Sequence, residues 1–264
     1  MSYETLLLEV KDSVATVTLN RPDSLNAMSE QMWRDFRGAF DEIFAAPGIR
    51  ALVLSGAGRA FSAGADLKSR VLEKATPDAR QPEEVLFELA TPVFKMLRDA
   101  PVPTIAAVNG ACAGAGVSLA LSCDFVIAAR SAFFLQAYIN LGLGPDMGGS
   151  WFVVRSVGAA RAFELFALGE RLSAQKAADW GLIHRCVDDM DLMSEAGKLS
   201  GKLASGPTKG YIFIRELNRA ACTNDLQTQI ELERQYYFSA KATDDACEAQ
   251  RAYAEKRPPI FKGR

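Results

Sequence analysis

The sequence predicts an α/β fold with a largely parallel sheet, followed by a region that is helical throughout. Short apolar runs at residues 51–54, 104–108 and 125–129 have the right length for strands buried on both faces. Stretches with helical spacing separate them, at about 84–97 and 115–121. Because this alternation is typical of βα units, we expect a single α/β core before the helical region.

The N-terminal part adds a pair of strands and an amphipathic helix. Residues 5–10 and 13–19 read as two strands joined by a tight turn, the second alternating apolar and polar side chains with a period of two. From Ser29 onward apolar residues recur every three or four positions, until Pro47 and the glycine after it end the run. A strand pair followed by one helix is therefore predicted.

The C-terminal part changes to an all-helical pattern. It begins beyond Ser205, with Pro207 near a helix start and charged stretches further along. We therefore divide the chain into an α/β core, residues 1–204, and a C-terminal helical region, residues 205–264. The helical region could pack on the core or on another subunit.

Composition excludes several classes of partner. A chain of 264 residues that is 49% hydrophobic is long enough for one large domain with a sizeable core. Its formal net charge of −2 offers no basic field, so neither nucleic acid nor a membrane is an expected partner. Five cysteines without a CxxC pair, beside a single histidine, favour neither a disulfide framework nor a metal site. Without a signal-peptide pattern or an apolar run of roughly 18 residues, a cytoplasmic protein is expected.

Two stretches of small residues, 61–66 and 109–116, carry the strongest functional signal. Both follow predicted buried strands, and ligands of open α/β sheets bind beyond the carboxyl ends of the strands. Small residues let a ligand approach backbone N–H groups closely, and the helix expected to begin near Ala115 leaves its first N–H groups without internal partners. Two such donors that converge on one oxygen would form an oxyanion hole. The alternative is a pair of glycine-rich turns without a ligand, beside a mobile loop expected at residues 68–82.

A dehydrogenase is one rival interpretation of the second stretch. Gly110, Gly114 and Gly116 match the GxxxGxG spacing of nucleotide-binding turns in short-chain dehydrogenases. That turn follows the first strand of such proteins, whereas here it comes much later in the chain. The Tyr–Lys pair at a spacing of four is also missing, because Gly142 stands four residues after Tyr138. A titration with NAD(P) would separate the two interpretations.

A serine hydrolase is the other rival interpretation. Ser118 lies in half of a GxSxG nucleophile elbow, but the second glycine is absent. Such an enzyme would need His184, the single histidine, as its base. Because His184 lies in an apolar strand expected at residues 182–187, we interpret it as a packed or surface residue.

A third motif, residues 142–151, places one carboxylate among glycines and apolar residues. Pro145 restricts the backbone before Asp146, and Gly148 permits close approach after it. A carboxylate desolvated by apolar neighbours becomes a stronger base, which suits Asp146 for proton abstraction. The alternative is that Asp146 is the N-cap of the helix that carries Trp151.

The three motifs, in this order and spacing, resemble the crotonase (enoyl-CoA hydratase/isomerase) superfamily. The likeness extends to residues 20–27, 177–183 and 259–264, and so spans nearly the whole chain. It implies a crotonase-like spiral of ββα units with a C-terminal helical trimerisation region, assembled as a homotrimer or a dimer of trimers. It also implies an acyl-CoA thioester substrate and no separate cofactor, since coenzyme A is part of the substrate.

The resemblance also implies roles for individual residues. The N–H groups of Ala65 and Ala115 correspond to the oxyanion-hole donors, and Asp146 to a catalytic carboxylate. The adenine end of coenzyme A is expected beside residues 63–67, and its pantetheine and phosphates near residues 24 and 25. The implied substrate-binding residues are Ser24, Leu25, Ala63, Asp66, Leu67, Gly114, Tyr138, Phe261 and Lys262, the last two reaching the same or a neighbouring subunit.

Departures from the hydratase pattern favour an isomerase. Hydratases of the superfamily use two glutamates, and the matching positions hold Ser118 and Tyr138, neither of which is a carboxylate base. Asp146 instead falls where a subset carries a working aspartate, including isomerases that act on ring-epoxidised phenylacetyl-CoA. The sequence therefore predicts that a double bond is moved through a thioester enolate. Hydration of a 2-enoyl-CoA and a non-catalytic acyl-CoA-binding role are the alternatives.

Overall fold

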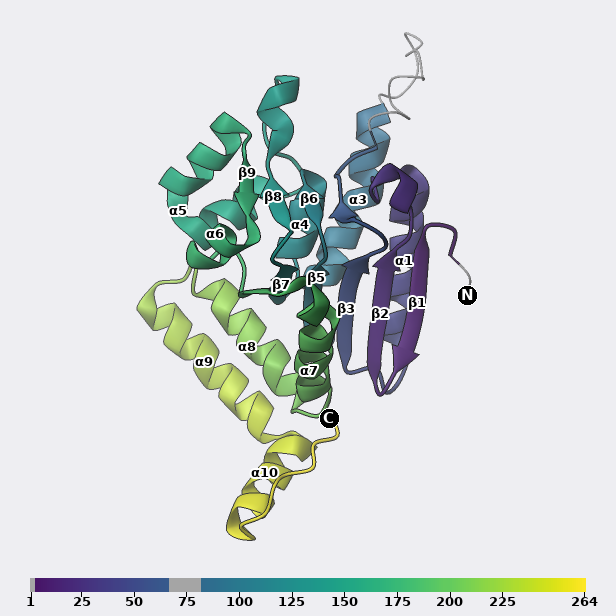
Figure 1. Ribbon diagram of the computed structural model, residues 1–264. Helices are drawn as coiled ribbons and strands as arrows, with labels where there is room; N and C mark the ends of the chain where they lie inside the picture. Colours follow the sequence, from purple (N-terminus) through teal and green to yellow (C-terminus); the bar gives the residue numbers. More distant parts are fainter. Residues whose placement is uncertain (1–2, 67–81) are drawn as a thin grey trace.

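The computed structural model describes residues 3–66 and 82–264, which form two sheets surrounded by helices (Figure 1). The larger sheet has the strand order β1-β2-β3-β5-β7-β10. The hairpin pair β1–β2 is antiparallel, and every other neighbouring pair in this sheet is parallel. Its strands are β1 (Leu6–Lys11), β2 (Val14–Leu19), β3 (Ala51–Gly56), β5 (Thr104–Val108), β7 (Phe125–Ala129) and β10 (Arg185–Val187).

A second, four-stranded sheet was not predicted from the sequence. Its order is β4-β6-β8-β9, with β8 and β9 antiparallel and the other pairs parallel. The strands are β4 (Ala60–Ser62), β6 (Ala111–Ala113), β8 (Phe133–Leu135) and β9 (Arg171–Ser173), each three residues long. Strands β4, β6 and β8 each follow a strand of the larger sheet, namely β3, β5 and β7. The chain therefore repeats a unit of one strand from each sheet, and the segments after β4, β6 and β8 all begin at the smaller sheet.

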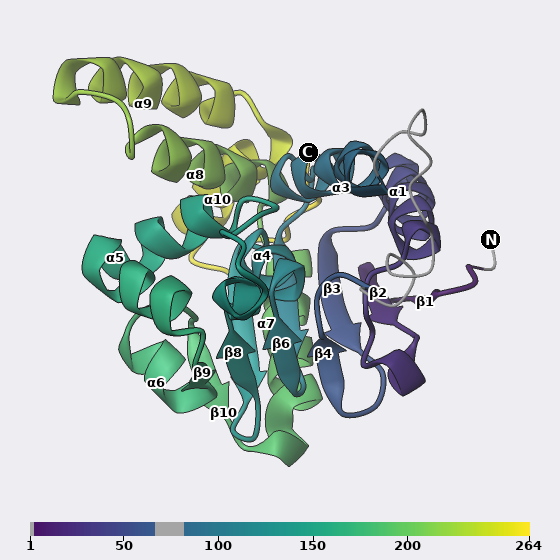
Figure 2. The ribbon, with the colours of Figure 1, turned by 90° about the horizontal axis from the view of Figure 1, so that it is seen from above.

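Helices cover both faces of the larger sheet (Figures 1 and 2). On one face α1 packs against α3, and on the other α7 packs against β3, β5 and β7. The helices of the core are α1 (Glu30–Ala45), α3 (Pro82–Arg98), α4 (Ala115–Leu121), α5 (Gly149–Leu168), α6 (Ala174–Asp179) and α7 (Leu192–Ala204). Short 3₁₀ turns lie at η1 (Pro22–Ser24), η2 (Ala137–Leu141) and η3 (Asp189–Asp191).

The first helix follows the predicted pattern closely. Ser29 caps α1, its Oγ accepting a hydrogen bond from the N–H of Met32, and satisfies a donor that the first helical turn leaves unpaired. Trp33 and Phe36 are buried on the inner face, and the Trp33 ring lies 5.6 Å from that of Phe94 on α3. The apolar stripe of α1 therefore builds the core that joins α1 and α3 to the sheet.

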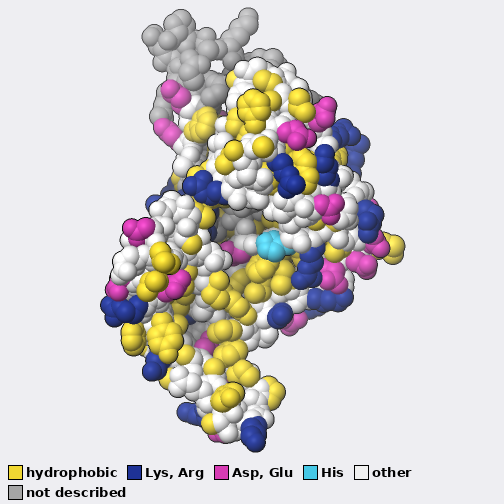
Figure 3. All heavy atoms as spheres, turned by 90° about the vertical axis from the view of Figure 1, so that its left-hand side faces the viewer, with side chains coloured by type: hydrophobic (Ala, Val, Ile, Leu, Met, Phe, Trp, Pro, Cys, Tyr) yellow, Lys and Arg dark blue, Asp and Glu magenta, His cyan; other side chains and the backbone are white. Residues whose placement is uncertain are grey.

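The C-terminal region is helical, as predicted, and extends away from the core (Figure 1). It consists of α8 (Thr208–Ala220), α9 (Leu226–Lys241) and α10 (Asp244–Ala254). Arg215 fastens α8 to the core, because its guanidinium pairs with Asp124 at 2.5 Å and donates to the carbonyls of Ala100 and Val102. Large apolar side chains remain exposed on these helices, and Figure 3 shows such side chains gathered on this face of the molecule. They include Ile214, Leu226, Ile230, Tyr237, Phe238 and Tyr253.

Two sequence expectations need comment. The strand expected at residues 182–187 is shorter, since β10 covers only Arg185–Val187 and His184 precedes it. The loop expected at residues 68–82 lies outside the described residues, apart from Pro82, which begins α3. No helix in the described part of the chain is both long enough and apolar enough to cross a membrane.

Candidate active site

The two glycine-bearing stretches lie in direct backbone contact. Gly64 has a φ of +89°, and a β-carbon there would lie 2.8 Å from the carbonyl oxygen of Ala113 and 3.5 Å from the nitrogen of Ala115. A β-carbon on Gly116 would lie 2.7 Å from the carbonyl oxygen of Ser62. Both glycines are therefore required by close approach, and the fold brings the backbones at residues 65 and 115 together.

The N–H groups of Ala65 and Ala115 are unpaired at this contact. Met28 bonds the residues on either side of Ala65, donating to the carbonyl of Gly64 at 2.8 Å and accepting from the N–H of Asp66 at 3.2 Å. Ala115 is the first residue of α4, after Gly114 at a φ of 50°. Within residues 3–66 and 82–264, neither N–H donates a hydrogen bond to another group. Two neighbouring donors of this kind can bind one oxygen that gains negative charge.

Two buried polar residues hold the first turn in place. The hydroxyl of Ser62 donates to the carbonyl of Asn26 at 2.8 Å and accepts from the N–H of Gly64 at 3.1 Å. The Asn26 amide donates to the carbonyls of Ala57 and Ala60 at 2.9 and 2.8 Å. Sequence reasoning did not single out either as a site residue, although Asn26 lies in a stretch that carries the family resemblance. Both act by fixing the backbone from which the Ala65 N–H projects.

Tyr138 connects this backbone site to the carboxylate of Asp146. Its ring carbon Cζ and its hydroxyl each lie 3.7 Å from the position of a β-carbon on Gly114. The hydroxyl donates to Oδ1 of Asp146 at 2.7 Å. Burial, together with the adjacent Asp146 carboxylate, raises the pKa of the Tyr138 phenol, so it stays protonated and remains a donor. The half-buried carboxylate of Asp146 is thus held next to the stretches 61–66 and 109–116.

Asp146 is not a helix cap, so that alternative interpretation is wrong. Helix α5 begins at Gly149, and its N-cap is Gly148, with a φ of 78° and no side-chain hydrogen bond to the helix. Only the backbone carbonyl of Asp146 takes part, accepting from the N–H of Gly149 at 2.8 Å. The left-handed conformation of Gly148 turns the chain into the helix and leaves the Asp146 side chain to bond Tyr138.

His184 is an exposed residue whose ring packs on one side against Phe125. Its ring lies 4.8 Å from that of Phe125, and its Nδ1 accepts from the N–H of Val126 at 3.3 Å. Burial lowers the pKa of His184, which favours the neutral ring that this bond requires. Among described residues the hydroxyl of Ser118 has no hydrogen-bond partner, so no Ser–His pair of a hydrolase is formed.

The residues expected around coenzyme A divide into two groups. The carbonyl of Leu25, which follows Ser24 at the end of η1, accepts from the N–H of Ala63 at 2.9 Å. Asp66 pairs with Arg21 at 2.9 Å. These residues therefore lie along one turn beside Ala65, whereas Leu67 falls outside the described residues.

Phe261 and Lys262 lie at the other end of the subunit. The carbonyl of Phe261 accepts from the guanidinium of Arg50, and the N–H of Lys262 donates to Asp245 at 2.6 Å. Arg50 immediately precedes β3, whereas Ala65 comes after the opposite end of β3 and after β4. The structure therefore does not bring the C-terminal tail to the glycine turns of its own subunit.

A cavity of about 520 Å³ lies between α3 and the start of α5. Met147, the residue after Asp146, lines it, and so do Trp151, Phe152 and, on α3, Phe87 and Phe94. Met147 and Trp151 belong to the third motif, residues 142–151, and both line this cavity. Leu143, in the same motif, is instead exposed.

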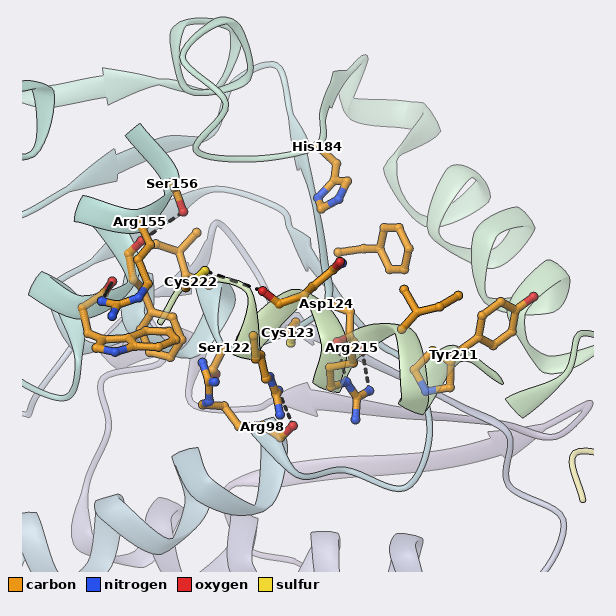
Figure 4. A pocket seen from close by; sticks show the side chains of 18 of the residues that line it. Arg98, Ser122, Cys123, Asp124, Arg155, Ser156, His184, Tyr211, Arg215 and Cys222 are labelled. Carbon is orange, nitrogen blue, oxygen red and sulfur yellow. Dashed lines mark hydrogen bonds and ion pairs between the residues drawn. The ribbon is translucent and has the colours of Figure 1, made fainter. Parts of the chain in front are cut away.

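A second cavity, of about 440 Å³, lies between β7, α5 and α8 (Figure 4). Arg215 and Asp124 form their ion pair in its wall, and His184 lies at another side. The guanidinium carbon of Arg98 lies 4.2 Å from the Trp151 ring centre, and that of Arg155 at 4.1 Å. The residues predicted to bind or convert the substrate do not line this cavity.

Comparisons with known proteins agree on one family. A family model described as enoyl-CoA hydratase/isomerase matches residues 9–264. The chain is 42% identical over 263 residues to the 1,2-epoxyphenylacetyl-CoA isomerase of Escherichia coli K12, covering 99% of each chain. It is 39% identical over 264 residues to a "probable enoyl-CoA hydratase" of Rhodobacter capsulatus, covering 100% of each.

Solved structures agree with this result. The enoyl-CoA hydratase of Bacillus anthracis has a TM-score of 0.91 at 32% identity, covering 99% of this chain and 100% of that one. That of Polaromonas sp. JS666 has a TM-score of 0.90 at 34% identity, covering 97% and 99%. Solved structures with enoyl-CoA hydratase names therefore share this fold.

Proposed function

The chain belongs to the enoyl-CoA hydratase/isomerase family, and on this premise we propose that it moves the double bond of an enoyl-CoA thioester. One observation carries the proposal: the carboxylate of Asp146 is held by Tyr138 beside a pair of unpaired backbone donors. This arrangement supplies a base and an anion site next to each other, which is what a proton shift alpha to a thioester requires.

The thioester carbonyl binds between the N–H groups of Ala65 and Ala115. Removing a proton from the neighbouring carbon moves charge onto that oxygen, and fixed donors stabilise it without reorganising during the reaction. Each donor contributes on the order of 100- to 1,000-fold in rate. The start of α4 adds the positive end of a helix dipole at the same place.

Asp146 transfers the proton. With a 3-enoyl-CoA, the carboxylate takes a proton from C2, and the C–H electron pair forms the enolate. The enolate then collapses, a double bond forms between C2 and C3, and C4 receives the proton from Asp146. Atoms and electrons balance without an oxidant, reductant or cofactor, and a positioned base of this kind contributes roughly 100- to 10,000-fold.

The neighbouring side chains favour isomerisation over hydration. Ser118 and Tyr138 occupy the positions at which the resemblance implies the two glutamates of hydratases. Because the raised pKa of Tyr138 keeps its phenol protonated, it serves as a donor and not as a base. The similarity to an isomerase at 42% identity supports the same choice.

Hydration of a 2-enoyl-CoA is the second candidate. It is favoured by the hydratase name of the Rhodobacter capsulatus relative at 39% identity. In that reaction Asp146 would direct a water to C3, and the same two N–H groups would hold the enolate. Both activities therefore need to be measured on the same preparation.

Coenzyme A binds along Ser24, Leu25, Ala63, Asp66 and Leu67, and the C-terminal tail comes from another subunit. The hydrogen bond between residues 25 and 63 supports the first part. The contribution of another subunit is supported by the position of Phe261 and Lys262, which lie at the opposite end of their own subunit. They can therefore reach a coenzyme A site only across a subunit interface.

The assembly is a trimer or a dimer of trimers formed through the C-terminal helices. The exposed apolar side chains on α8, α9 and α10 support this, because large contiguous apolar surfaces of this kind mark interaction sites. Light scattering after gel filtration would measure the mass directly. A monomer of 28.6 kDa at micromolar concentration would contradict the assembly and the shared site together.

The deciding experiment compares the wild type with Asp146→Asn, using a 3-enoyl-CoA and following formation of the conjugated 2-enoyl-CoA by absorbance. Isomerisation should fall by about 100-fold or more, while coenzyme A thioester binding stays near that of the wild type. Asp41→Asn, on the exposed side of α1, is the matched control and should keep full activity. Equal activity in Asp146→Asn, or hydration without isomerisation, would contradict the proposal.

A further inference from the structure

Two buried polar side chains near the Tyr138–Asp146 pair, those of Ser118 and Gln136, have no hydrogen-bond partner among the described residues. The side chain of Ser118 is on a residue that is 0% exposed, and Gln136 is 2% exposed. Within the described ranges, the Ser118 hydroxyl and both polar atoms of the Gln136 amide have no hydrogen-bond partner. Leaving a buried polar group without a hydrogen bond destabilises the fold, so native proteins satisfy such groups with protein partners or internal water.

The unpaired atoms converge on one place. A β-carbon on Gly149 would lie 3.2 Å from Oγ of Ser118 and 3.9 Å from Oε1 of Gln136. Ser118 comes from α4, Gln136 precedes η2, and Gly149 begins α5, so three elements meet there. Residue 149 is glycine, so its own side chain does not fill the space between the hydroxyl and the amide, and the nearest other side-chain atom to this point is Cβ of Pro145, at 3.7 Å.

This place adjoins the phenol of Tyr138. The N–H of Ser118 donates to the carbonyl of Gly114 at 3.4 Å, and the Tyr138 hydroxyl lies 3.7 Å from the position of a β-carbon on Gly114. Ser118 and the phenol therefore both lie against Gly114. The order of groups is therefore Gln136, Ser118, Tyr138 and Asp146.

We propose that Ser118, Gln136 and one internal water molecule form a positioning site for the Tyr138 hydroxyl. The water bridges the Gln136 amide and the Ser118 hydroxyl, and satisfies both. The Ser118 hydroxyl then donates a hydrogen bond to the phenol oxygen of Tyr138. Because Ser118 acts as the donor in this bond, the phenol hydrogen is directed to the carboxylate of Asp146. Ser118 and Gln136 act through Tyr138 and are positioning residues. This proposal rests on the proposed function only for its kinetic consequence.

A crystal structure that resolves ordered water tests the site independently of turnover. Density for one water within hydrogen-bond distance of Ser118 Oγ and the Gln136 amide would support it. A direct Ser118–Gln136 hydrogen bond, or an empty space, would overturn it. In a Gln136→Met crystal, the water should be lost and the Tyr138 hydroxyl should move away from Oδ1 of Asp146; an unchanged Tyr138 would overturn the positioning role.

Kinetic measurements test whether Ser118 and Gln136 act through Tyr138. Ser118→Ala and Gln136→Met should each lower kcat by about 3- to 10-fold, the effect of losing one hydrogen bond, with KM unchanged. In a Tyr138→Phe background each should change kcat by less than about 2-fold, because residues that act through one group are not additive.

The matched control is Ser122→Ala, at the C-cap of the same helix, α4. Ser122 is 4% exposed, and its hydroxyl already donates to the carbonyl of Leu119. It should leave kcat unchanged in both backgrounds. Full-size effects of Ser118→Ala and Gln136→Met in the Tyr138→Phe background would overturn the proposal. A wild type that converts neither 3-enoyl-CoA nor 2-enoyl-CoA would refute the proposed function alone, and the two crystal structures would still decide this one.

Discussion

The hydroxyl of Tyr138 donates a hydrogen bond to Oδ1 of Asp146, with 2.7 Å between the two oxygens. No described residue hydrogen-bonds to Oδ2 of Asp146, so one carboxylate oxygen is fixed and the other faces no protein donor in the described part of the chain. A base held through one oxygen keeps its orientation while the other oxygen transfers a proton. This hydrogen bond therefore orients the carboxylate that we propose as the base.

Tyr138→Phe should lower kcat by about 10-fold or more and leave KM almost unchanged. A hydrogen bond to a charged group contributes about 1.5 to 3 kcal/mol, and here it orients the base, whereas the proposed donors to the thioester carbonyl are backbone N–H groups. The control is Tyr3→Phe, which also removes a tyrosine–carboxylate bond, from Tyr3 to Glu42 at 2.8 Å, far from the site. If the two variants have the same kcat, the positioning role of Tyr138 is refuted.

Gly64→Ala should destabilise the protein and abolish activity. Its φ of +89° costs an L-residue about 1 to 2 kcal/mol, and the contact of 2.8 Å with the carbonyl of Ala113 adds roughly 1 to 3 kcal/mol of overpacking. Gly142→Ala is the control, since Gly142 has a φ of +70° with nothing within 4 Å of the added carbon. Urea unfolding should show a larger loss of unfolding free energy for Gly64→Ala than for Gly142→Ala. Equal losses would mean that the backbones at residues 64 and 113 can move apart without cost.

Arg215→Met should lower the free energy of unfolding by about 3 to 5 kcal/mol. The substitution leaves the Asp124 carboxylate, whose side chain is 19% exposed, without the guanidinium that pairs with it. Arg234→Met removes an exposed pair with Glu231 and should cost less than about 0.5 kcal/mol. Denaturant unfolding followed by circular dichroism measures both, and similar values would show that α8 does not depend on this ion pair.

His184 should make stability sensitive to mild acid. Burial lowers the pKa of its ring in the folded protein, so the unfolded chain, with an ordinary value of about 6.5, binds a proton more readily. Stability is therefore full above about pH 6.5 and falls as the pH drops below that value, until the folded ring is protonated as well.

The test compares urea unfolding of the wild type and His184→Gln at pH 7.5 and 5.5. The wild type should lose more stability between the two pH values than the variant, which carries no titrating ring. Because the untagged chain has a single histidine, NMR titration of the ring can follow its pKa directly. An ordinary or raised pKa would contradict the expected direction.

The local patterns of the chain were sufficient to predict most long elements. The strands Thr104–Val108 and Phe125–Ala129 and the helix Ala115–Leu121 begin and end where the apolar spacing places them. These elements can be predicted because the apolar residues that each of them buries are neighbours in the sequence. The second sheet gives no such signal, since its strands are three residues long and pair only with distant segments.

The third motif shows where local reasoning fails. Asp146 precedes a helix closely enough to cap it, and its sequence neighbourhood fits a cap as well as a base. The structure decides between them, because Gly148 takes a φ of 78° and lets the helix begin without a side-chain cap. The carboxylate then bonds Tyr138, a partner that sequence spacing did not indicate.

The sequence by itself determined that this chain forms an α/β core with a helical C-terminal region and carries glycine turns suited to close backbone approach. The tertiary structure alone decided that residues 64 and 115 meet, that Tyr138 holds Asp146, and that Phe261 lies far from the turns of its own subunit. The physical reason is distance along the chain. Propensity and periodicity act among residues a few positions apart, whereas these contacts depend on how two sheets and several helices pack.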